Sequence, residues 1–402
     1  EEGSGNVKDI QSGDIVTLPH EASLTALNKI TLNGASLSKK AKKANNKDDD
    51  SSTELRRHLA TTGTKTVVAV KVIAAGQKSV ANYNDIDAVV EAVMQSTLSS
   101  QISGRVLSLN VKAGDRVCAV VPNMPESIVA FLAASSLGAI WSSCSPDFGE
   151  RGILDRFGQI EPKILITCDG YYYAGKTIRM AEKIGNVLKE LKSVERALVI
   201  DYIGEADAVA TALPKGETLS AFVSGHSDAP IAFAQLPPDH PLYILYSSGT
   251  TGIPKCIVHG AGGILLKHLS EHVLNTDTKP TDKLFYFSTC GWMMWNWLVS
   301  GLAAGATLLL YDGSPFHPSE RVLFDYADDE GMTIFGTSAK YIDAVKKSGL
   351  VPMETHKLSS LRAMLSTGSP LSAESFDFVH SGIKADMQIA SISGGTDICG
   401  CF

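Results

Sequence analysis

The residues best suited to chemistry form one continuous loop, Ser247-Ser-Gly-Thr-Thr-Gly-Ile-Pro-Lys255, directly after the apolar run Leu242-Tyr-Ile-Leu-Tyr246. The loop members that could contact an anion are Ser247, Ser248, Gly249, Thr250, Thr251, Gly252 and Lys255. Glycine lets backbone N–H groups approach an anion closely, hydroxyls donate further hydrogen bonds, and lysine adds a point charge. The loop is therefore predicted to bind phosphate, although an ordinary polar turn after a strand uses the same residue types.

The spacing of this loop differs from that of the Walker A loop. In Gly-x-x-x-x-Gly-Lys-[Ser/Thr], the lysine follows the second glycine directly and a helix begins there. Here Ile253 and Pro254 separate Gly252 from Lys255. The spacing excludes a P-loop NTPase, and the chain contains neither the Gly-x-Ser-x-Gly motif of hydrolases nor the His-Glu-x-x-His motif of zinc proteases.

The elements that must position the loop alternate between strand-like and helix-like patterns from about Val106 onward. Short apolar runs occupy residues 116–121, 139–141, 163–167, 197–200, 242–246, 306–311 and 333–335, and residues 125–137 read as a helix. Alternation of this kind predicts an α/β fold with largely parallel sheets. Residues 201–240 are more polar and are expected to form surface structure that leads into a second subdomain.

Composition limits the possible partners. The 402 residues are 44% hydrophobic and 20% charged, with a formal net charge of -7, so the chain has no general attraction to nucleic acid or anionic lipid. No apolar run approaches the ~20 residues needed to cross a bilayer, and no signal peptide is recognisable. We expect no nucleic-acid partner, no membrane insertion and a cytoplasmic location with reduced cysteines, Cys399 and Cys401 serving as packing residues rather than metal ligands.

Residues 1–104 read differently from the rest and are expected to be an atypical, partly disordered segment. A basic run, Lys39-Lys-Ala-Lys-Lys43, precedes an acidic one, which suggests a solvated linker; a nuclear-address or phosphate-binding patch is the alternative. Residues 66–73 resemble a strand and residues 86–94 a helix.

Four further segments, together with the loop, resemble the acyl-adenylate-forming (AMP-binding) superfamily and most closely its acetoacetyl-CoA synthetase branch. They are Gly138-Ala-Ile-Trp-Ser-Ser-Cys-Ser-Pro-Asp-Phe-Gly149, Asp155-Arg-Phe-Gly-Gln-Ile160, Cys290-Gly-Trp-Met-Met-Trp-Asn-Trp297 and Ser391-Ile-Ser-Gly-Gly-Thr-Asp-Ile398. The resemblance runs in family order from about Val106 to Phe402. It implies an acid-thiol ligase of lipid metabolism that uses ATP, Mg²⁺ and coenzyme A to convert a short carboxylic acid, such as acetoacetate, into an acyl-adenylate and then a thioester.

The resemblance also implies roles for individual residues. Lys255 and its loop would hold the β- and γ-phosphates, Thr396 would contact the α-phosphate, and Asp397 would bind magnesium where the family carries Glu. Gly368, Ser369 and Pro370 would line the adenine pocket, with Ser391, Ile392, Ser393, Gly394, Gly395 and Thr396 forming the opposite wall. Acetate-specific relatives have a Trp at the position of Gly394, so its absence favours an acid larger than acetate.

Trp292, Trp295 and Trp297 form an aromatic cluster that could be core or substrate contact, and Trp292 is our candidate for the substrate. His259 is expected to be structural, because activation of a bound carboxylate needs no general base.

The expected organisation is a large N-terminal domain of the acyl-adenylate-forming fold, incomplete at its C-terminus. Residues 105–240 would form its first α/β subdomain and residues 241–402 the second, with the C-terminal lid domain absent. Truncation is expected to reduce turnover, and a catalytically inactive nucleotide-binding scaffold stays open as the alternative.

Overall fold

The computed structural model describes residues 111–224, 226, 230–247 and 252–402, together with four short strands nearer the N-terminus. These strands are β1 (Thr17–Pro19), β2 (Thr31–Leu32), β3 (Ala35–Ser36) and β4 (Val67–Ala69); β1 pairs with β4 and β2 with β3. The chain divides into two compact units, Glu1–Ser99 and Ser100–Phe402. β4 falls inside the strand predicted at residues 66–73, whereas the basic run and the helix predicted at residues 86–94 lie outside the described residues.

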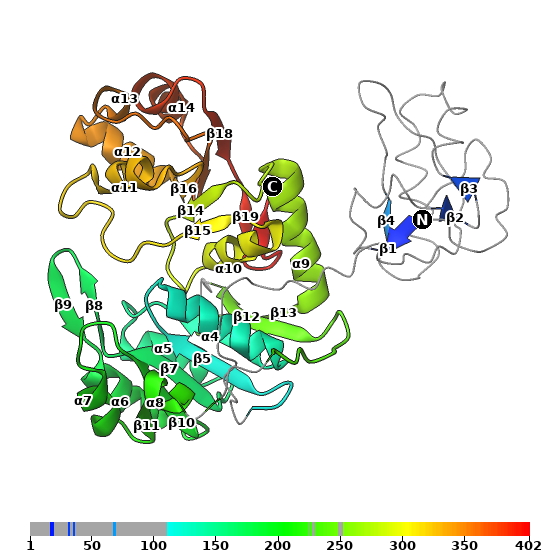
Figure 1. Ribbon diagram of the computed structural model, residues 1–402, viewed down its shortest axis with the longest axis vertical. Coiled ribbons are helices and arrows are strands. Elements are labelled where there is room, and N and C mark those ends of the chain that lie inside the picture. The colour runs from blue at the N-terminus through cyan, green and yellow to red at the C-terminus, as the bar shows by residue number, and fades with distance from the viewer. Residues whose placement is uncertain are drawn as a thin grey trace. The chain divides into compact units, whose positions relative to one another are not determined.

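The first sheet of the second unit has seven strands in the order β11-β10-β7-β5-β6-β12-β13 (Figure 1). Its parallel strands are β5 (Arg116–Val120), β6 (Ile140–Cys144), β7 (Ile164–Cys168), β10 (Arg196–Ile200), β11 (Gly216–Thr218) and β12 (Pro241–Ser247). β13 (Lys255–Gly260) is antiparallel to β12 at the edge. The central strands are buried along nearly their whole length, which explains why they read as continuous apolar runs rather than alternating ones.

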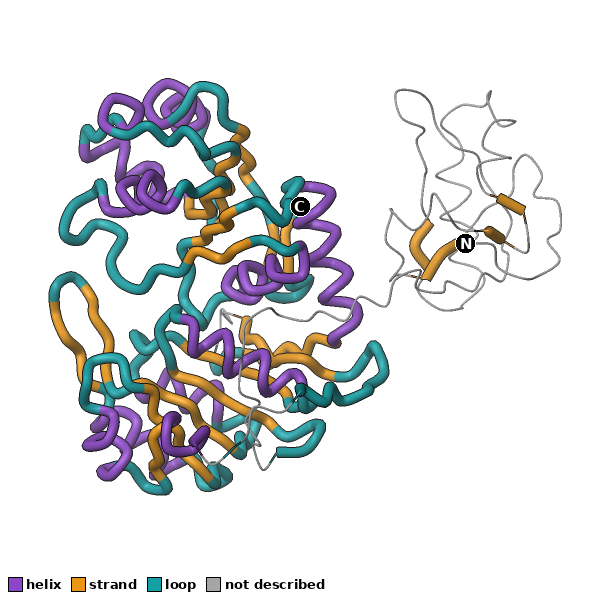
Figure 2. Tube along the Cα trace, viewed as in Figure 1, coloured by secondary structure: helices purple, strands orange, loops and turns teal. Residues whose placement is uncertain are grey.

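Helices and one hairpin complete this part (Figure 2). The helices are α4 (Pro125–Ser136), α5 (Glu150–Phe157), α6 (Ala181–Glu190), α7 (Ala206–Ala212), α8 (Leu219–Ser224) and α9 (Ala261–Ser270), and the hairpin is β8 (Gly170–Tyr173) with β9 (Lys176–Arg179). α4 begins with Pro125, where a missing N–H costs nothing, and the chain turns out of it at Gly138 with φ 75°. The interval 201–240, expected as surface structure, contains α7, β11 and α8.

The second sheet has five parallel strands in the order β15-β14-β16-β17-β18. They are β14 (Lys283–Tyr286), β15 (Thr307–Leu309), β16 (Ile334–Ser338), β17 (Ala363–Thr367) and β18 (Gln388–Ser391). The accompanying helices are η1 (Glu271–Asn275), α10 (Met293–Ser300), η2 (Gly301–Ala304), α11 (Val322–Glu330), α12 (Ala339–Ser348), α13 (Pro352–Thr355), α14 (Ala373–Phe378) and η3 (Val379–Ile383). The chain ends in a small hairpin, β19 (Gly394–Gly395) and β20 (Gly400–Cys401).

Alternate residues of the second sheet enter two different cores. Phe285, Phe335 and Met364 pack with Leu323 and Ile342 of α11 and α12. Their sequence neighbours on the same strands, including Leu284, Ile334 and Leu365, pack instead with Trp297 and Leu298 of α10. The sheet is therefore covered on both faces, as the period of two in side-chain direction requires.

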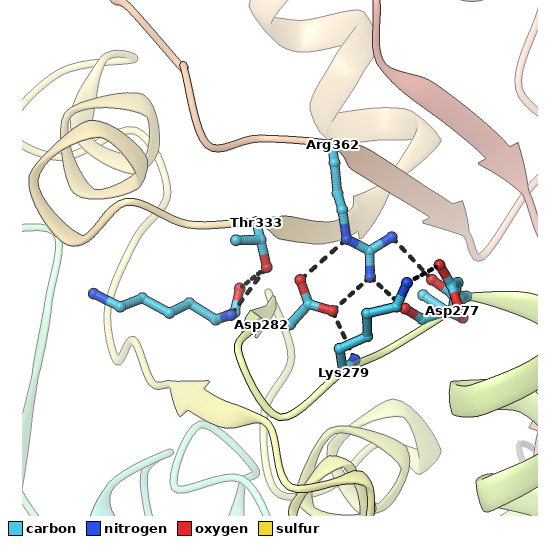
Figure 3. A network of polar contacts seen from close by, with 7 residues as sticks. Asp277, Lys279, Asp282, Thr333 and Arg362 are labelled. Atoms are coloured by element: carbon cyan, nitrogen blue, oxygen red, sulfur yellow. Dashed lines mark hydrogen bonds and ion pairs between the residues drawn. The ribbon is translucent and has the colours of Figure 1, made fainter.

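A polar network ties together the starting ends of these strands (Figure 3). Arg362, just before β17, donates hydrogen bonds of 3.0 and 2.6 Å to the Asp282 carboxylate and of 3.1 and 2.9 Å to the carbonyls of Thr276 and Asp277. Burial alone would raise the pKa of Asp282, but Arg362 and the backbone N–H of Lys279 bond its ionised form and lower the pKa overall. Arg362 therefore stabilises the buried negative charge of Asp282 and links the segment before β17 to the segment before β14.

The predicted α/β fold with largely parallel sheets is confirmed. The subdomain boundary differs, because β12 and β13, which lie after residue 240, belong to the first sheet, where Tyr243 pairs with Trp141. The apolar run of β12 predicts a strand with neighbours on both sides, but the run does not indicate which sheet those neighbours belong to. Within the described residues, no helix combines the length and hydrophobicity needed to span a bilayer.

Candidate functional site

The predicted phosphate loop joins two antiparallel strands. β12 ends at Ser247 and β13 begins at Lys255, and these two residues pair across the hairpin. Ser248, Gly249, Thr250 and Thr251 lie outside the described residues, while Lys255 is exposed beside them. A hairpin replaces the strand-to-helix turn of a Walker A loop, so the exclusion of that class stands on backbone geometry as well as spacing.

Residues 155–160, one of the segments that carry the family resemblance, support this loop from the end of α5 and the turn that follows it. The amide nitrogen of Gln159 donates to the carbonyl of Pro254 at 2.8 Å and to the carbonyl of Asp155 at 2.6 Å. The Arg156 guanidinium lies over the ring of Tyr246, 5.6 Å from its centroid. The two contacts hold the two ends of the loop against α5 and the turn that follows it, a role that the sequence motif alone did not reveal.

Thr396 and Asp397 lie at the tip of the β19–β20 hairpin. The Cys399 N–H donates to the Thr396 carbonyl at 3.2 Å and closes the turn, while Ser393 and Phe402 exchange backbone hydrogen bonds of 2.9 and 2.8 Å at its open end. Asp397 is exposed. The hairpin thus carries a hydroxyl residue and a carboxylate residue in succession at a turn that backbone hydrogen bonds close.

This hairpin is held by the elements that frame the phosphate loop. Tyr243 of β12 places its hydroxyl 3.2 Å from Cys399 Sγ, and His268 of α9 places Nε2 2.6 Å from the Cys399 carbonyl. His259 of β13 is buried and lies edge-on to the Tyr243 ring; burial lowers its pKa, while the Thr396 carbonyl and Asp397 act in the opposite direction. The hairpin that carries Thr396 and Asp397 is therefore attached to β12, β13 and α9, the elements that flank the predicted phosphate loop in the sequence.

The two segments predicted to line the nucleotide site are neighbouring strand ends. At the ends of β17 and β18, Ile392 N–H donates to the Ser366 carbonyl at 2.8 Å and Thr367 Oγ1 to the Ile392 carbonyl at 3.0 Å. Leu371 N–H then reaches Ser391 Oγ at 3.3 Å. Gly368, Ser369 and Pro370, together with Ser391, Ser393 and Gly394, are exposed at this edge. Carboxyl ends of parallel strands are where open α/β sheets bind ligands.

Gly394 is constrained by packing. A Cβ at this position would lie 2.0 Å from the carbonyl oxygen of Gly400 and 2.8 Å from Cys401 Sγ. No side chain fits there without moving β20. The missing indole therefore leaves no open space in this direction, and the contribution of Gly394 to an acyl pocket stays a prediction.

The three clustered tryptophans divide between core and surface. Trp295 and Trp297 are at most 2% exposed, whereas Trp292, at the start of α10, is 61% exposed. Trp295 donates to Asn123 Oδ1 at 3.0 Å, and Trp297 donates to Glu271 Oε2 at 2.8 Å. Of the three, only Trp292 is accessible to a substrate.

The residues present fit magnesium only as a companion of a nucleotide. The described part of the chain contains no group of three or more His, Cys, Asp or Glu side chains that could hold a metal ion. Mg²⁺ is commonly bound by one or two carboxylates, with substrate phosphates and waters completing the shell. The exposed carboxylate of Asp397 suits that arrangement.

Comparison with known proteins assigns the chain to a family. Residues 96–402 match the family model described as "AMP-binding enzyme", which is more than half of the chain. The chain belongs to the AMP-binding enzyme family. This assignment confirms the predicted resemblance and agrees with the layered α/β architecture.

Several similar proteins of this family are acetoacetyl-CoA synthetases. An "Acetoacetyl-coenzyme A synthetase" of Rhizobium meliloti (strain 1021) is 58% identical over 305 residues, which covers 76% of this chain and 47% of the relative. An "Acetoacetyl-CoA synthetase" of Xenopus tropicalis is 46% identical over 73% of this chain and 44% of its own length. The solved structure of "Acetoacetyl-CoA Synthetase from Streptomyces lividans" superposes with a TM-score of 0.68 at 44% identity, covering 73% of this chain and 45% of that one. The chain thus spans a little under half the length of these relatives.

Sequence reasoning missed the residues that join the two halves of the site. Tyr243, His268 and Glu271 are buried polar side chains within or just after the loop hairpin, and His259 was noted only as structural. The available signal was His268-x-x-Glu271-His272 in a helical stretch rich in leucine and isoleucine, since ionisable residues on an apolar face are rarely buried without partners.

Proposed function

We propose that this chain activates a short carboxylic acid, acetoacetate in the first instance, with ATP to give an acyl-adenylate and pyrophosphate. The acyl group then passes to the thiol of coenzyme A with release of AMP. The observation that carries the proposal is the contact of the hairpin bearing Thr396 and Asp397 with strand β12 and helix α9, which lie on either side of the loop in the sequence. The named relatives support the acid and the thiol.

In this proposal each residue meets a different part of the triphosphate. Lys255 and the loop donors hold the β- and γ-phosphates, where positive charge stabilises the departing pyrophosphate. The Thr396 hydroxyl contacts the α-phosphate, which the carboxylate attacks. Asp397 is the protein ligand of magnesium, which supplies charge neutralisation when bound with the nucleotide.

The remaining assignments complete the ligand sites. The adenine is lined by Gly368, Ser369 and Pro370 and by the strand end at residues 391–395. The acid lies beside Trp292, which is the accessible member of its tryptophan cluster. The seven cysteines are all free and six of them are buried, and we infer a reducing, cytoplasmic environment from them.

Binding and exchange measurements test this proposal. MgATP affinity is measured by calorimetry, and pyrophosphate exchange into ATP is measured with acetate, butyrate and acetoacetate. We expect acetoacetate to give the fastest exchange. Lys255→Ala should weaken MgATP binding by about tenfold or more, since loss of a charge-assisted phosphate contact is worth about 1.5–3 kcal/mol. Lys192→Ala, a change at another exposed lysine, should leave both quantities unaltered.

The outcomes separate the alternatives. Absence of MgATP binding by the wild-type chain overturns the assignment of the loop. MgATP binding without exchange for any acid favours the nucleotide-binding scaffold. Asp397→Asn should reduce the gain in ATP affinity that magnesium provides, and Asp397→Glu should retain it.

A further inference from the structure

The turn that carries Thr396 and Asp397 ends in a strained residue. Cys399 has φ 45°, in the left-handed region that residues other than glycine seldom occupy. Such a conformation is strained and persists only where the surroundings enforce it. Strain of this kind is concentrated at functional sites, and here it depends on the contacts that hold Cys399.

The strongest contact comes from His268. Its Nε2 lies 2.6 Å from the Cys399 carbonyl oxygen, and since a carbonyl only accepts, Nε2 carries the hydrogen. Nδ1 is buried and has no hydrogen-bond partner among the described residues. Burial lowers the pKa of His268 to about 3, so the imidazole stays neutral and keeps this tautomer.

A second contact acts on the same residue. The Tyr243 hydroxyl lies 3.2 Å from Cys399 Sγ, inside the core below the turn. Burial raises the pKa of Cys399 to about 12, so the thiol stays protonated and does not act as a nucleophile. Cys399 is thus held at both its carbonyl and its side chain.

The following strand is held from the same helical segment. Glu271, three residues after His268, accepts the N–H of Cys401 at 3.1 Å, and its carboxylate also accepts from Trp297 and Lys267. A Cβ on Gly400 would lie 2.4 Å from this carboxylate, so β20 passes directly beneath Glu271. The segment that follows the phosphate loop therefore holds the hairpin at two successive points.

We propose that His268 is a positioning residue that sets the place of Thr396 and Asp397 relative to the phosphate loop by fixing the Cys399 carbonyl. The inference rests on the proposed function, since it matters only if these two residues contact a nucleotide. A displacement of about 1 Å in a positioned group can reduce a rate by ~100-fold. His268 touches no reacting atom.

The test compares His268→Ala with His268→Gln in the full chain, because a glutamine amide nitrogen can replace Nε2 as donor. His272→Ala is the matched control: His272 is also buried in this helical segment, but it donates to the Trp297 carbonyl at 2.9 Å and not to the hairpin. Circular dichroism checks folding, hydrogen exchange of residues 394–402 reports the hairpin without nucleotide, and calorimetry gives MgATP affinity.

We expect His268→Ala to accelerate hydrogen exchange in residues 394–402 and to weaken MgATP binding by about tenfold or more. His268→Gln should restore both to within about threefold of the wild type, and His272→Ala should change neither. If His268→Ala does not fold, Tyr243→Phe removes only the hydroxyl contact to Cys399 and should shift both readouts in the same direction by about two- to fivefold.

Two negative results are distinguishable. If the wild type binds no MgATP, the proposed function fails and the positioning role fails with it. If the wild type binds MgATP, and hydrogen exchange and affinity in a folded His268→Ala variant equal those of the wild type, the positioning role alone is overturned.

Discussion

Gly394 faces Cys401 across the β19–β20 hairpin, and the paired strands are so close that a methyl group at residue 394 would lie 2.8 Å from Cys401 Sγ. The neighbouring Gly395 is different, since a Cβ there would meet no atom within 4 Å. Two adjacent glycines in one motif thus have different physical requirements.

Gly394→Ala is expected to destabilise the chain by about 2–3 kcal/mol, because overpacking forces β20 to move. Gly395→Ala should change the free energy of unfolding by less than about 0.5 kcal/mol. Urea denaturation followed by circular dichroism measures both. Equal stability of the two variants would show that the hairpin yields without cost.

Gln159→Ala should weaken MgATP binding about two- to fivefold while leaving stability nearly unchanged. Gln159 is exposed, and its hydrogen bond to Pro254 anchors the loop rather than the core. Calorimetry provides the affinity. Gln235→Ala, which removes an exposed amide that donates to the Phe233 carbonyl, is a control that should bind as the wild type does.

Arg362→Met should lower the free energy of unfolding by roughly 3 kcal/mol, because it leaves the buried Asp282 carboxylate without its partner. Arg321→Met removes an exposed ion pair to Asp325 at 3.5 Å and should cost less than about 1 kcal/mol. Chemical denaturation at pH 7 compares the two. A loss of equal size for both would contradict the role assigned to the network in Figure 3.

Stability should fall as the pH is lowered from 7 to 5. Burial lowers the pKa of His268 to about 3 and of His272 to about 4, both below the ordinary 6.5. Below pH 6.5 the unfolded chain binds protons at these imidazoles and the folded chain does not, so acid favours the unfolded chain. The contribution of the neutral histidines to the free energy of unfolding is therefore complete above pH 6.5 and decreases as the pH falls toward their pKa values in the folded chain. Two such histidines account for up to about 4 kcal/mol over this interval.

The double variant His268→Gln/His272→Gln tests that assignment. Denaturation midpoints at pH 7 and pH 5 should differ much less in the double variant than in the wild type. The same difference in both proteins would place the acid sensitivity on other groups.

Much of the fold was predictable because the strands of the parallel sheets are buried along their length. The runs at residues 116–121 and 197–200 coincide with β5 and β10 to within a residue. The run at residues 306–311 is longer than β15, which is an edge strand whose pairing ends at Leu309. The membership of β12 in the first sheet was not predictable, since pairing between distant strands leaves no periodic trace in either one.

The candidate site was predictable only in its exposed parts. Glycines, hydroxyls and Lys255 show their chemistry in the sequence, whereas Tyr243 and His268 act by holding Cys399, which lies more than 130 residues away. Such contacts depend on tertiary placement. Gly394 illustrates the same limit. It is a glycine because the backbone of β20 passes close to it, and its motif does not show this.

The contacts of β12, β13, α9 and η1 with the hairpin have a consequence for recombination between homologous proteins. Residues 241–275 contain the loop and the side chains that hold Cys399 and Cys401. These residues and residues 394–402 should therefore come from the same parent protein. A chimera that takes only one of the two segments from another protein would combine side chains and a hairpin that did not evolve together. Chimeras that exchange both together should keep the geometry of the donor.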